Sequence, residues 1–139
     1  MKTLLISVLI LFTGVYTTLR AQSTELDGKT FHIKLTITKG NPKAGSTWTK
    51  DVLTFTEGNL NAEFMSEHEG FPSAACEIKI DSTSGKKTIT FSASHTNTGG
   101  SVIKWEGKIV GDKIEGTAVW KYIQGPRTYS FTGTLKKEK

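Results

Sequence analysis

The feature that most constrains the fold is a two-residue alternation of apolar and polar side chains that recurs after residue 28. In residues 31–38 the odd positions are apolar and the even positions are polar, and residues 88–94 and 128–135 repeat this arrangement. Because successive side chains of a strand point to opposite faces, each stretch has one buried face and one wet face. The alternation therefore predicts β-strands that cover a common interior.

Eight such stretches are separated by turn residues. The predicted strands span residues 29–38, 51–57, 59–68, 75–81, 87–95, 101–110, 113–122 and 127–136. We find no convincing helical periodicity in the sequence. Short turns such as residues 57–59 and 110–113 favour pairing between consecutive strands. The predicted fold class is all-β, a single antiparallel up-and-down β-barrel of about eight strands.

Glycines on the predicted inner face support a strongly coiled barrel. Gly107, Gly116 and Gly133 each lie two residues after an apolar residue of the same face. Glycine weakens a flat strand but permits the sharp bends and close approach that a barrel needs. Closing the last strand onto the first would also remove the exposed sheet edges.

The first residues have the features of a secretory signal peptide. Lys2 gives a positive start, residues 4–15 are almost wholly apolar, and Ala21 is a small residue suited to cleavage. The apolar run is shorter than the roughly 20 residues that a membrane-spanning helix needs. We therefore expect a signal peptide over residues 1–21, a barrel domain over residues 22–139, and a secreted or periplasmic protein without a membrane span after cleavage.

The composition indicates which classes of binding partner this protein is expected to have. The net charge is +5 for the whole chain, and +3 for residues 22–139, where 16 basic residues face 13 acidic ones. The lysines are scattered and form no basic stripe with interleaved aromatic residues, so we expect no nucleic-acid partner. Cys76 is the only cysteine, so an internal disulfide is impossible and the core must provide the stability.

The connections predict which end of the barrel is open. In an up-and-down barrel the connections at residues 39–50, 69–74, 96–100 and 123–126 share one end, and they are the longer ones. Loops tolerate variation and commonly carry binding residues, whereas tight turns seal the opposite end. We call the looped end the mouth and the other the closed end.

Strand direction predicts a set of inward-facing candidates for ligand binding near the mouth. They are Arg127, Tyr129, Tyr122, Trp120, Trp105, His95, Phe91 and Phe64. Arg127 is the only arginine of residues 22–139, and its guanidinium forms a fixed fork that suits a carboxylate. We therefore expect non-enzymatic binding of a small, partly apolar or amphipathic molecule. The competing interpretation is that these aromatic residues fill a solid barrel.

Two short motifs resemble the calycins, the superfamily of lipocalins, avidins and fatty-acid-binding proteins. Residues 27–31, Asp-Gly-Lys-Thr-Phe, are similar to the opening of the first calycin strand. Arg127-Thr128-Tyr129 resembles the Arg-x-Tyr pair with which fatty-acid-binding proteins hold a carboxylate. The resemblance implies a ligand such as a fatty acid held by Arg127 and Tyr129. The chain departs from the pattern at Phe31, where lipocalins have Trp, and lacks a predicted helical lid. It also resembles small exported bacterial barrels without an assigned activity.

A metal-dependent enzyme is an alternative function. His68, Cys76 and His95 would meet at the mouth if the predicted strands hold, and two imidazoles with one thiolate suit zinc with an open position for water. Their spacing matches no compact metal motif, and a Gly-x-Ser-x-Gly elbow is absent from the sequence. We therefore favour binding over catalysis and predict no cofactor.

The alternative that we rank above the enzyme is a module that binds a protein or glycan through its loops, with a filled barrel as scaffold. Trp48 falls in the longest predicted loop, and Phe71-Pro72 lies in another loop at the same end. Exposed aromatic residues on adjacent loops are typical of macromolecular interfaces. The competing interpretation is that Trp48 folds over the barrel end as a plug.

Overall fold

The computed structural model describes residues 24–39, 47–83, 85–121 and 125–137. The predicted signal peptide and its cleavage at Ala21 lie outside these residues. The strands are β1 (Thr30–Lys39), β2 (Thr47–Thr56), β3 (Asn59–Ala62), β4 (Ala74–Asp81), β5 (Thr88–Thr96), β6 (Val102–Val110), β7 (Lys113–Lys121) and β8 (Arg127–Leu135). One helix, α1 (Glu63–Glu69), lies between β3 and β4. In the described part of the chain, no helix is long and apolar enough to cross a membrane.

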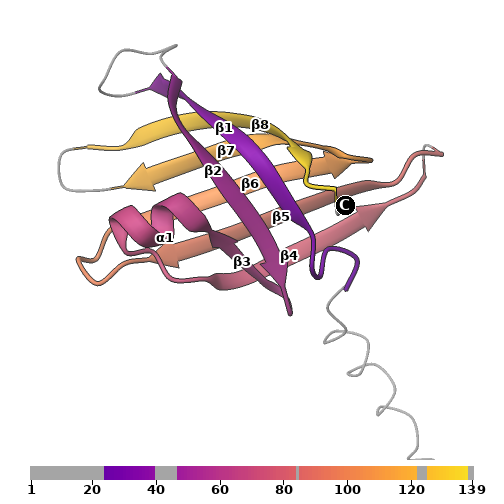
Figure 1. Cartoon of the computed structure of the whole chain (residues 1–139), viewed down its shortest axis with the longest axis horizontal. Coiled ribbons are helices and arrows are strands. Elements are labelled where there is room, and N and C mark those ends of the chain that lie inside the picture. The colour runs from indigo at the N-terminus through magenta and orange to yellow at the C-terminus, as the bar shows by residue number, and fades with distance from the viewer. Residues whose placement is uncertain (1–23, 40–46, 84, 122–124, 138–139) are drawn as a thin grey trace, which may run out of the picture.

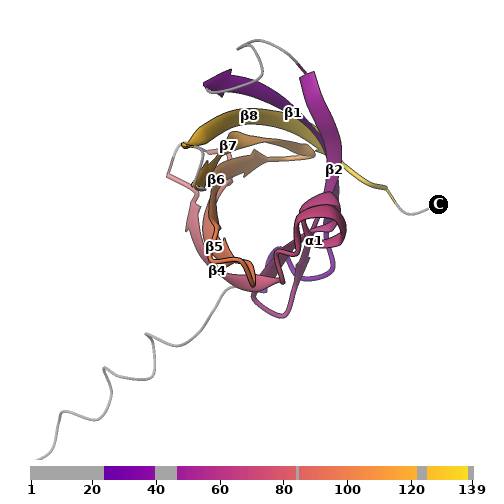
Figure 2. The same cartoon turned by 90° about the vertical axis from the view of Figure 1, so that its left-hand side faces the viewer.

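The strands form a closed barrel in sequence order, and all neighbours are antiparallel. The predicted all-β, up-and-down, eight-stranded barrel is therefore confirmed (Figures 1 and 2). β1 closes it by pairing with β2 and with β8, and the register shifts after Leu35 on one side and after Ile37 on the other. Such irregularities bend a strand, and the bend allows β1 to pair with β2 on one side and with β8 on the other.

The inner wall is built in rows that cross neighbouring strands at one level. One row holds Phe91, Gly107, Gly116 and Phe131 on β5, β6, β7 and β8. A Cβ atom at Gly107 would lie 2.6 Å from the Phe91 ring, and one at Gly116 would lie 2.7 Å from the Phe131 ring. The glycines therefore leave the space that the two rings occupy, in the alternation of small and large residues that fills small barrels.

Aromatic rings meet across the interior. Phe55 of β2 lies 5.1 Å from Phe91 of β5, measured between ring centroids, although the two strands are not neighbours in the sheet. Phe131 then contacts both Phe91, at 6.4 Å, and Trp105, at 5.4 Å. Since these rings are buried, the middle of the barrel is a packed core.

The closed end is sealed by the residues that precede β1. Leu26 is fully buried there. The N–H of Gly28 donates to the Phe55 carbonyl at 2.7 Å, and the N–H of Phe55 donates to the Lys29 carbonyl at 3.0 Å. These bonds extend the pairing of β1 with β2 back to Gly28 and hold the segment before β1 at the barrel end (Figure 1). We infer that the buried Leu26 side chain plugs this end.

The prediction of a strand over residues 59–68 is wrong beyond Ala62, because α1 begins at Glu63. Buried positions shift from every second residue, at Leu60 and Ala62, to a three-residue step at Met65. The helix ends at Gly70, whose φ of 72° lies in the left-handed region that favours glycine. The search for helical periodicity did not reveal α1, which has only seven residues.

The predicted start of the second strand, at residue 51, is wrong. β2 begins at Thr47, so the backbone of Trp48 lies in a strand and not in the predicted loop of residues 39–50. Threonine and tryptophan both favour strands, and Thr47, Thr49 and Lys50 pair with β1. The predicted connection of residues 39–50 is therefore shorter by residues 47–50, which belong to β2.

Candidate functional site

The end of the barrel that carries α1 holds polar side chains on its inner wall. His95, Ile103, Trp120 and Arg127 form the row nearest this end, on β5, β6, β7 and β8. The next row inward contains Trp105 and Tyr129. We call the five polar or amphipathic members of these rows the mouth layer: His95, Trp105, Trp120, Arg127 and Tyr129.

His95 is 2% exposed and has one hydrogen-bond partner in the described structure. Its Nδ1 lies 2.7 Å from the Pro72 carbonyl oxygen, which only accepts, so Nδ1 carries the proton. Burial lowers the pKa of His95, with the bond to Pro72 acting in the opposite sense. The neutral ring therefore presents Nε2 as an acceptor, and this atom is buried without a hydrogen-bond partner among the described residues.

Trp105 provides the complementary group. Its side chain is fully buried, and its Nε1–H has no acceptor among the residues that the structure describes. Nearby in the register, an Nη1–H of Arg127 donates to the Tyr129 hydroxyl at 3.3 Å. The mouth layer thus combines N–H donors with one imidazole acceptor, within a wall of aromatic rings.

The segment after α1 covers the mouth layer. Phe71 is 2% exposed and packs edge-on against Trp120, with the ring centroids 5.7 Å apart. Pro72 supplies the carbonyl that holds His95. Asn97 also donates from Nδ2 to the Glu69 carbonyl at 3.1 Å, which ties the end of α1 to the connection between β5 and β6. Figure 2 shows α1 beside β2 at this end of the barrel.

The predicted binding residues fall into four groups. His95, Trp105, Trp120, Arg127 and Tyr129 lie on the inner wall as expected. Phe91 is deeper, in the packed core, where it contacts Phe55. Phe64 is half-buried on α1, so its expected place on an inner strand face is wrong. Tyr122 lies outside the described residues.

The three metal candidates do not gather. His68 is exposed on α1 and stacks on Phe64, with the ring centroids 4.4 Å apart. Cys76 is buried on β4, and burial raises the pKa of its thiol to about 11, which keeps it protonated and unreactive. Among the described residues, no group of three or more His, Cys, Asp or Glu side chains is arranged to hold a metal ion.

The aromatic residues proposed for loop-mediated binding are differently placed from the expectation. Phe71 is buried against Trp120 instead of exposed, because it plugs the barrel end. The backbone of Trp48 belongs to β2. This alternative therefore loses Phe71 as an exposed aromatic residue, although the filled interior on which it also rests is present.

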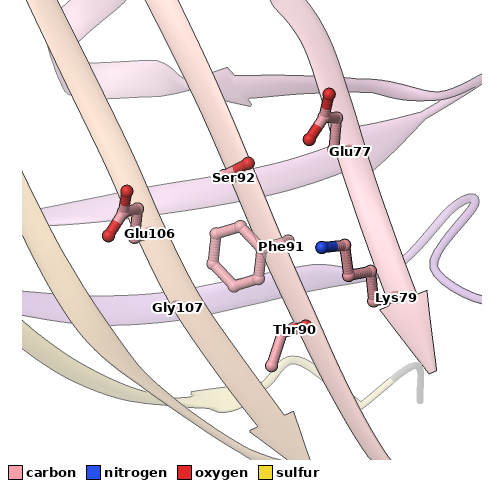
Figure 3. Close-up of a pocket in the computed structure, with 7 residues that line it drawn as sticks. All are labelled: Glu77, Lys79, Thr90, Phe91, Ser92, Glu106 and Gly107. Atoms are coloured by element: carbon pink, nitrogen blue, oxygen red, sulfur yellow. The ribbon is translucent and has the colours of Figure 1, made fainter. Parts of the chain in front are cut away.

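The outer wall carries a shallow pocket of about 310 Å3 over β4, β5 and β6. Glu77, Ser92 and Glu106 form one row across these strands, and Figure 3 shows the two carboxylates on opposite sides of Ser92. Both glutamates are exposed, and Glu106 already pairs with Lys104 at 3.0 Å. We interpret this row as the solvated outer face of the sheet, since exposed carboxylates there retain water.

Two features of functional interest are not apparent from the sequence, one at the mouth layer and one outside it. One is the Pro72 carbonyl, which no side-chain pattern reveals. The other is Asp51, which shares the inner face of β2 with Leu53 and Phe55, whereas the predicted strand of residues 51–57 only begins at this residue. The alternation of residues 51–55 itself places a carboxylate on the apolar face, and this signal identifies Asp51 as unusual.

No protein-family model, no curated protein and no solved structure matches this chain. The resemblance to calycins therefore stands at the level of the closed, eight-stranded antiparallel barrel.

Proposed function

We propose that this protein is an exported, non-enzymatic binding protein for a small, partly apolar ligand whose polar end enters the mouth layer. The observation that carries the proposal is the pair of buried polar atoms, His95 Nε2 and Trp105 Nε1, without partners in the described structure. Leaving such an atom buried and unpaired costs about 1–3 kcal/mol. A ligand that pairs with these atoms would recover this cost. Export is supported by the sequence of residues 1–21.

The mouth layer favours a polar end with acceptor oxygens. The Trp105 N–H and the Arg127 guanidinium both donate, and a guanidinium fork matches the two oxygens of a carboxylate. His95 Nε2 would accept from a hydroxyl or N–H on the same ligand. A carboxylate on a short apolar body, as in the fatty acids suggested by the Arg127-x-Tyr129 motif, fits this set.

The packed core limits the size of the apolar body. Phe91 and Phe131 are in ring contact directly below the mouth layer, so a long chain has no free path toward the closed end. The ligand body would instead lie against Trp120 and Phe71, near the barrel end. Entry requires movement of the Phe71–Pro72 segment, because Phe71 covers Trp120 and Pro72 binds His95.

Calorimetry with octanoate and 1-octanol tests the proposal, since the two share an apolar body and differ in the polar end. We expect octanoate to bind more tightly than 1-octanol. The variant Arg127→Lys keeps the positive charge but removes the fork, and should weaken octanoate binding by about tenfold, or 1.4 kcal/mol. Lys104→Arg, on the exposed outer face of β6, is the matched control and should bind like the unmodified protein.

Absence of octanoate binding, or equal binding by the Arg127→Lys variant, would overturn the assignment of the polar end to Arg127. Binding that is equal for octanoate and 1-octanol would show that the mouth layer does not recognise the carboxylate. Absence of octanoate binding would favour the alternative of a filled barrel that binds a protein or glycan through its loops.

A further inference from the structure

We propose that the pocket between α1 and strands β1 and β2 binds a primary ammonium group, with Asp51 as the receiving carboxylate. This pocket has a volume of about 260 Å3, and both Asp51 and side chains of α1 line it. It is distinct from the mouth layer, none of whose members line it. Pockets that hold drug-sized ligands begin at about 300 Å3, so this one suits a smaller molecule.

Asp51 is a buried carboxylate, and one of its two oxygens already accepts hydrogen bonds from the backbone. Its side chain is 4% exposed, and Oδ1 accepts hydrogen bonds of 2.7 Å from the backbone N–H groups of Val52 and Phe64. Because β3 ends at Ala62, α1 takes the place beside this part of β2, and Asp51 ties its first turn to the strand. These hydrogen bonds satisfy Oδ1 and account for its position, but neither of them involves Oδ2.

Oδ2 of Asp51 is buried and has no hydrogen-bond partner in the described part of the chain. Burial raises the pKa of Asp51, since the ionised form has lost water without gaining a cation, and the nearby Glu63 acts in the same direction. The backbone N–H groups of Phe64, Val52 and Met65 act in the opposite sense and only partly offset the burial. A positively charged N–H donor would give Oδ2 both a hydrogen-bond partner and an opposite charge. Charge-assisted hydrogen bonds of this kind are the strongest that a carboxylate makes.

The rest of the pocket strengthens the preference for a cation. Glu63 and Glu67 line it from α1, and among the described residues neither lies within 4.0 Å of a basic side chain. Lys50 and His32 line it from the strands, so three carboxylates face one ammonium and one imidazole. The excess of negative charge attracts a cation, while Lys50 limits the total charge that the pocket accepts.

The apolar lining sets the shape of the ligand. Val52 and Phe64 are half-buried and line the pocket beside Asp51. They offer a surface for a short hydrocarbon or aromatic body attached to the ammonium. A metal ion is a poorer fit, because the described residues include no group of three His, Cys, Asp or Glu arranged as a metal site.

The test uses three probes with one apolar body: 2-phenylethylamine, its N,N,N-trimethyl derivative and 2-phenylethanol. Titrations are followed through the backbone amide NMR signals of Val52 and Phe64 in the full folded protein. We expect saturable shifts with 2-phenylethylamine. The trimethyl cation lacks an N–H donor and the alcohol lacks the charge, so each should bind about tenfold more weakly or worse.

Asp51→Asn is the decisive variant, because the asparagine carbonyl can still accept the two backbone N–H groups while the charge is removed. It should weaken 2-phenylethylamine binding by about tenfold or more. Glu106→Gln, which removes one negative charge from the exposed outer wall, is the matched control and should leave binding unchanged. If Asp51→Asn fails to fold, Glu63→Gln with Glu67→Gln on the exposed face of α1 replaces it, with weaker binding expected.

An ammonium group belongs either to a free amine or to a lysine side chain of a partner protein. Nα-acetyl-lysine N-methylamide distinguishes these sources: tighter binding than 2-phenylethylamine identifies a lysine side chain, and weaker binding identifies a free amine. The proposal is overturned if 2-phenylethylamine gives no saturable shift, if the trimethyl cation binds equally well, or if the folded Asp51→Asn variant binds as before. Octanoate binding to Asp51→Asn reports separately on the mouth layer, which does not contain Asp51.

Discussion

Each end of the barrel is plugged by its own buried apolar side chain, but the two plugging segments are held by different kinds of interaction. At the closed end, Leu26 is fixed by backbone hydrogen bonds between Gly28, Lys29 and Phe55. At the mouth, Phe71 lies over a layer of polar side chains, and His95 is held by the carbonyl of the covering segment.

The difference lies in how completely the polar atoms are paired. Backbone pairing at the closed end satisfies the groups that it buries, as strand ladders do. The mouth leaves His95 Nε2 and Trp105 Nε1 buried without partners in the described structure. Natural proteins tend to keep such unfavourable features at functional sites. The comparison therefore favours a structural role for the closed end and supports our proposal that the mouth binds a ligand.

The largest expected effect comes from removing the plug of the closed end. Leu26→Ala should lower the free energy of unfolding by about 2–5 kcal/mol, because it deletes a fully buried side chain and leaves a cavity. Urea denaturation measures this change. Ile80→Ala is the matched control, since Ile80 is 41% exposed and its truncation should stay within about 0.5 kcal/mol. Equal costs for the two variants would contradict a structural role for Leu26.

An intermediate effect is expected in the wall that both ends share. A Cβ atom at Gly116 would lie 2.1 Å from the Glu106 carbonyl oxygen, so backbone must shift. Gly116→Ala should therefore cost about 1–3 kcal/mol of unfolding free energy. For Gly99, the nearest atom to an added Cβ is 3.5 Å away, so Gly99→Ala should be close to neutral in the same urea measurement. A neutral Gly116→Ala would show that the barrel is less tightly coiled than described.

The smallest effect is a pH dependence that belongs to the mouth alone. Burial lowers the pKa of His95 from its ordinary value of 6.5, so the unfolded chain binds this proton more readily than the folded one. Stability should therefore fall as the pH drops below about 6.5 toward the lowered pKa of the folded state. Thermal unfolding across this range measures the slope.

His95→Asn provides the control for this pH dependence, since an asparagine amide can donate to the Pro72 carbonyl but does not titrate. His32 and His68 are present in both proteins, so their contributions cancel in the comparison. The difference in slope between the two proteins should vanish above about pH 6.5. Identical slopes below that pH would argue against a buried neutral His95.

The sequence was sufficient for most of the barrel because strand period and turn chemistry agree. Residues 88–94 alternate strictly, and the predicted turn at Glu57-Gly58 is confirmed by positive φ values of 50° and 80°. The prediction failed where period and propensity conflict. Residues 63–69, Glu-Phe-Met-Ser-Glu-His-Glu, contain no β-branched residue but three glutamates and a methionine, and this composition favours a helix before Gly70 more than the partial alternation favours a strand.

The sequence predicts the site only where side-chain parity determines it, that is, where odd and even positions of a strand face opposite sides of the sheet. Parity places His95 and Arg127 on the inner wall, and the register puts them in one row. Parity does not reveal that Phe71 and Pro72 fold back over that row, because the contact depends on the course of an irregular segment. The burial of Asp51 also depends on α1 replacing the rest of β3, which the alternation concealed.

The most direct measurement of the central claim is the indole N–H signal of Trp105 in a proton–nitrogen NMR spectrum during titration with octanoate. Trp105→Phe assigns the signal. If the mouth layer receives the polar end of a ligand, this signal should shift and saturate, while the backbone amide of Leu26 at the closed end stays in place. A Trp105 signal that does not move while octanoate binds, or a shift at Leu26 instead, would contradict the assignment of binding to the mouth.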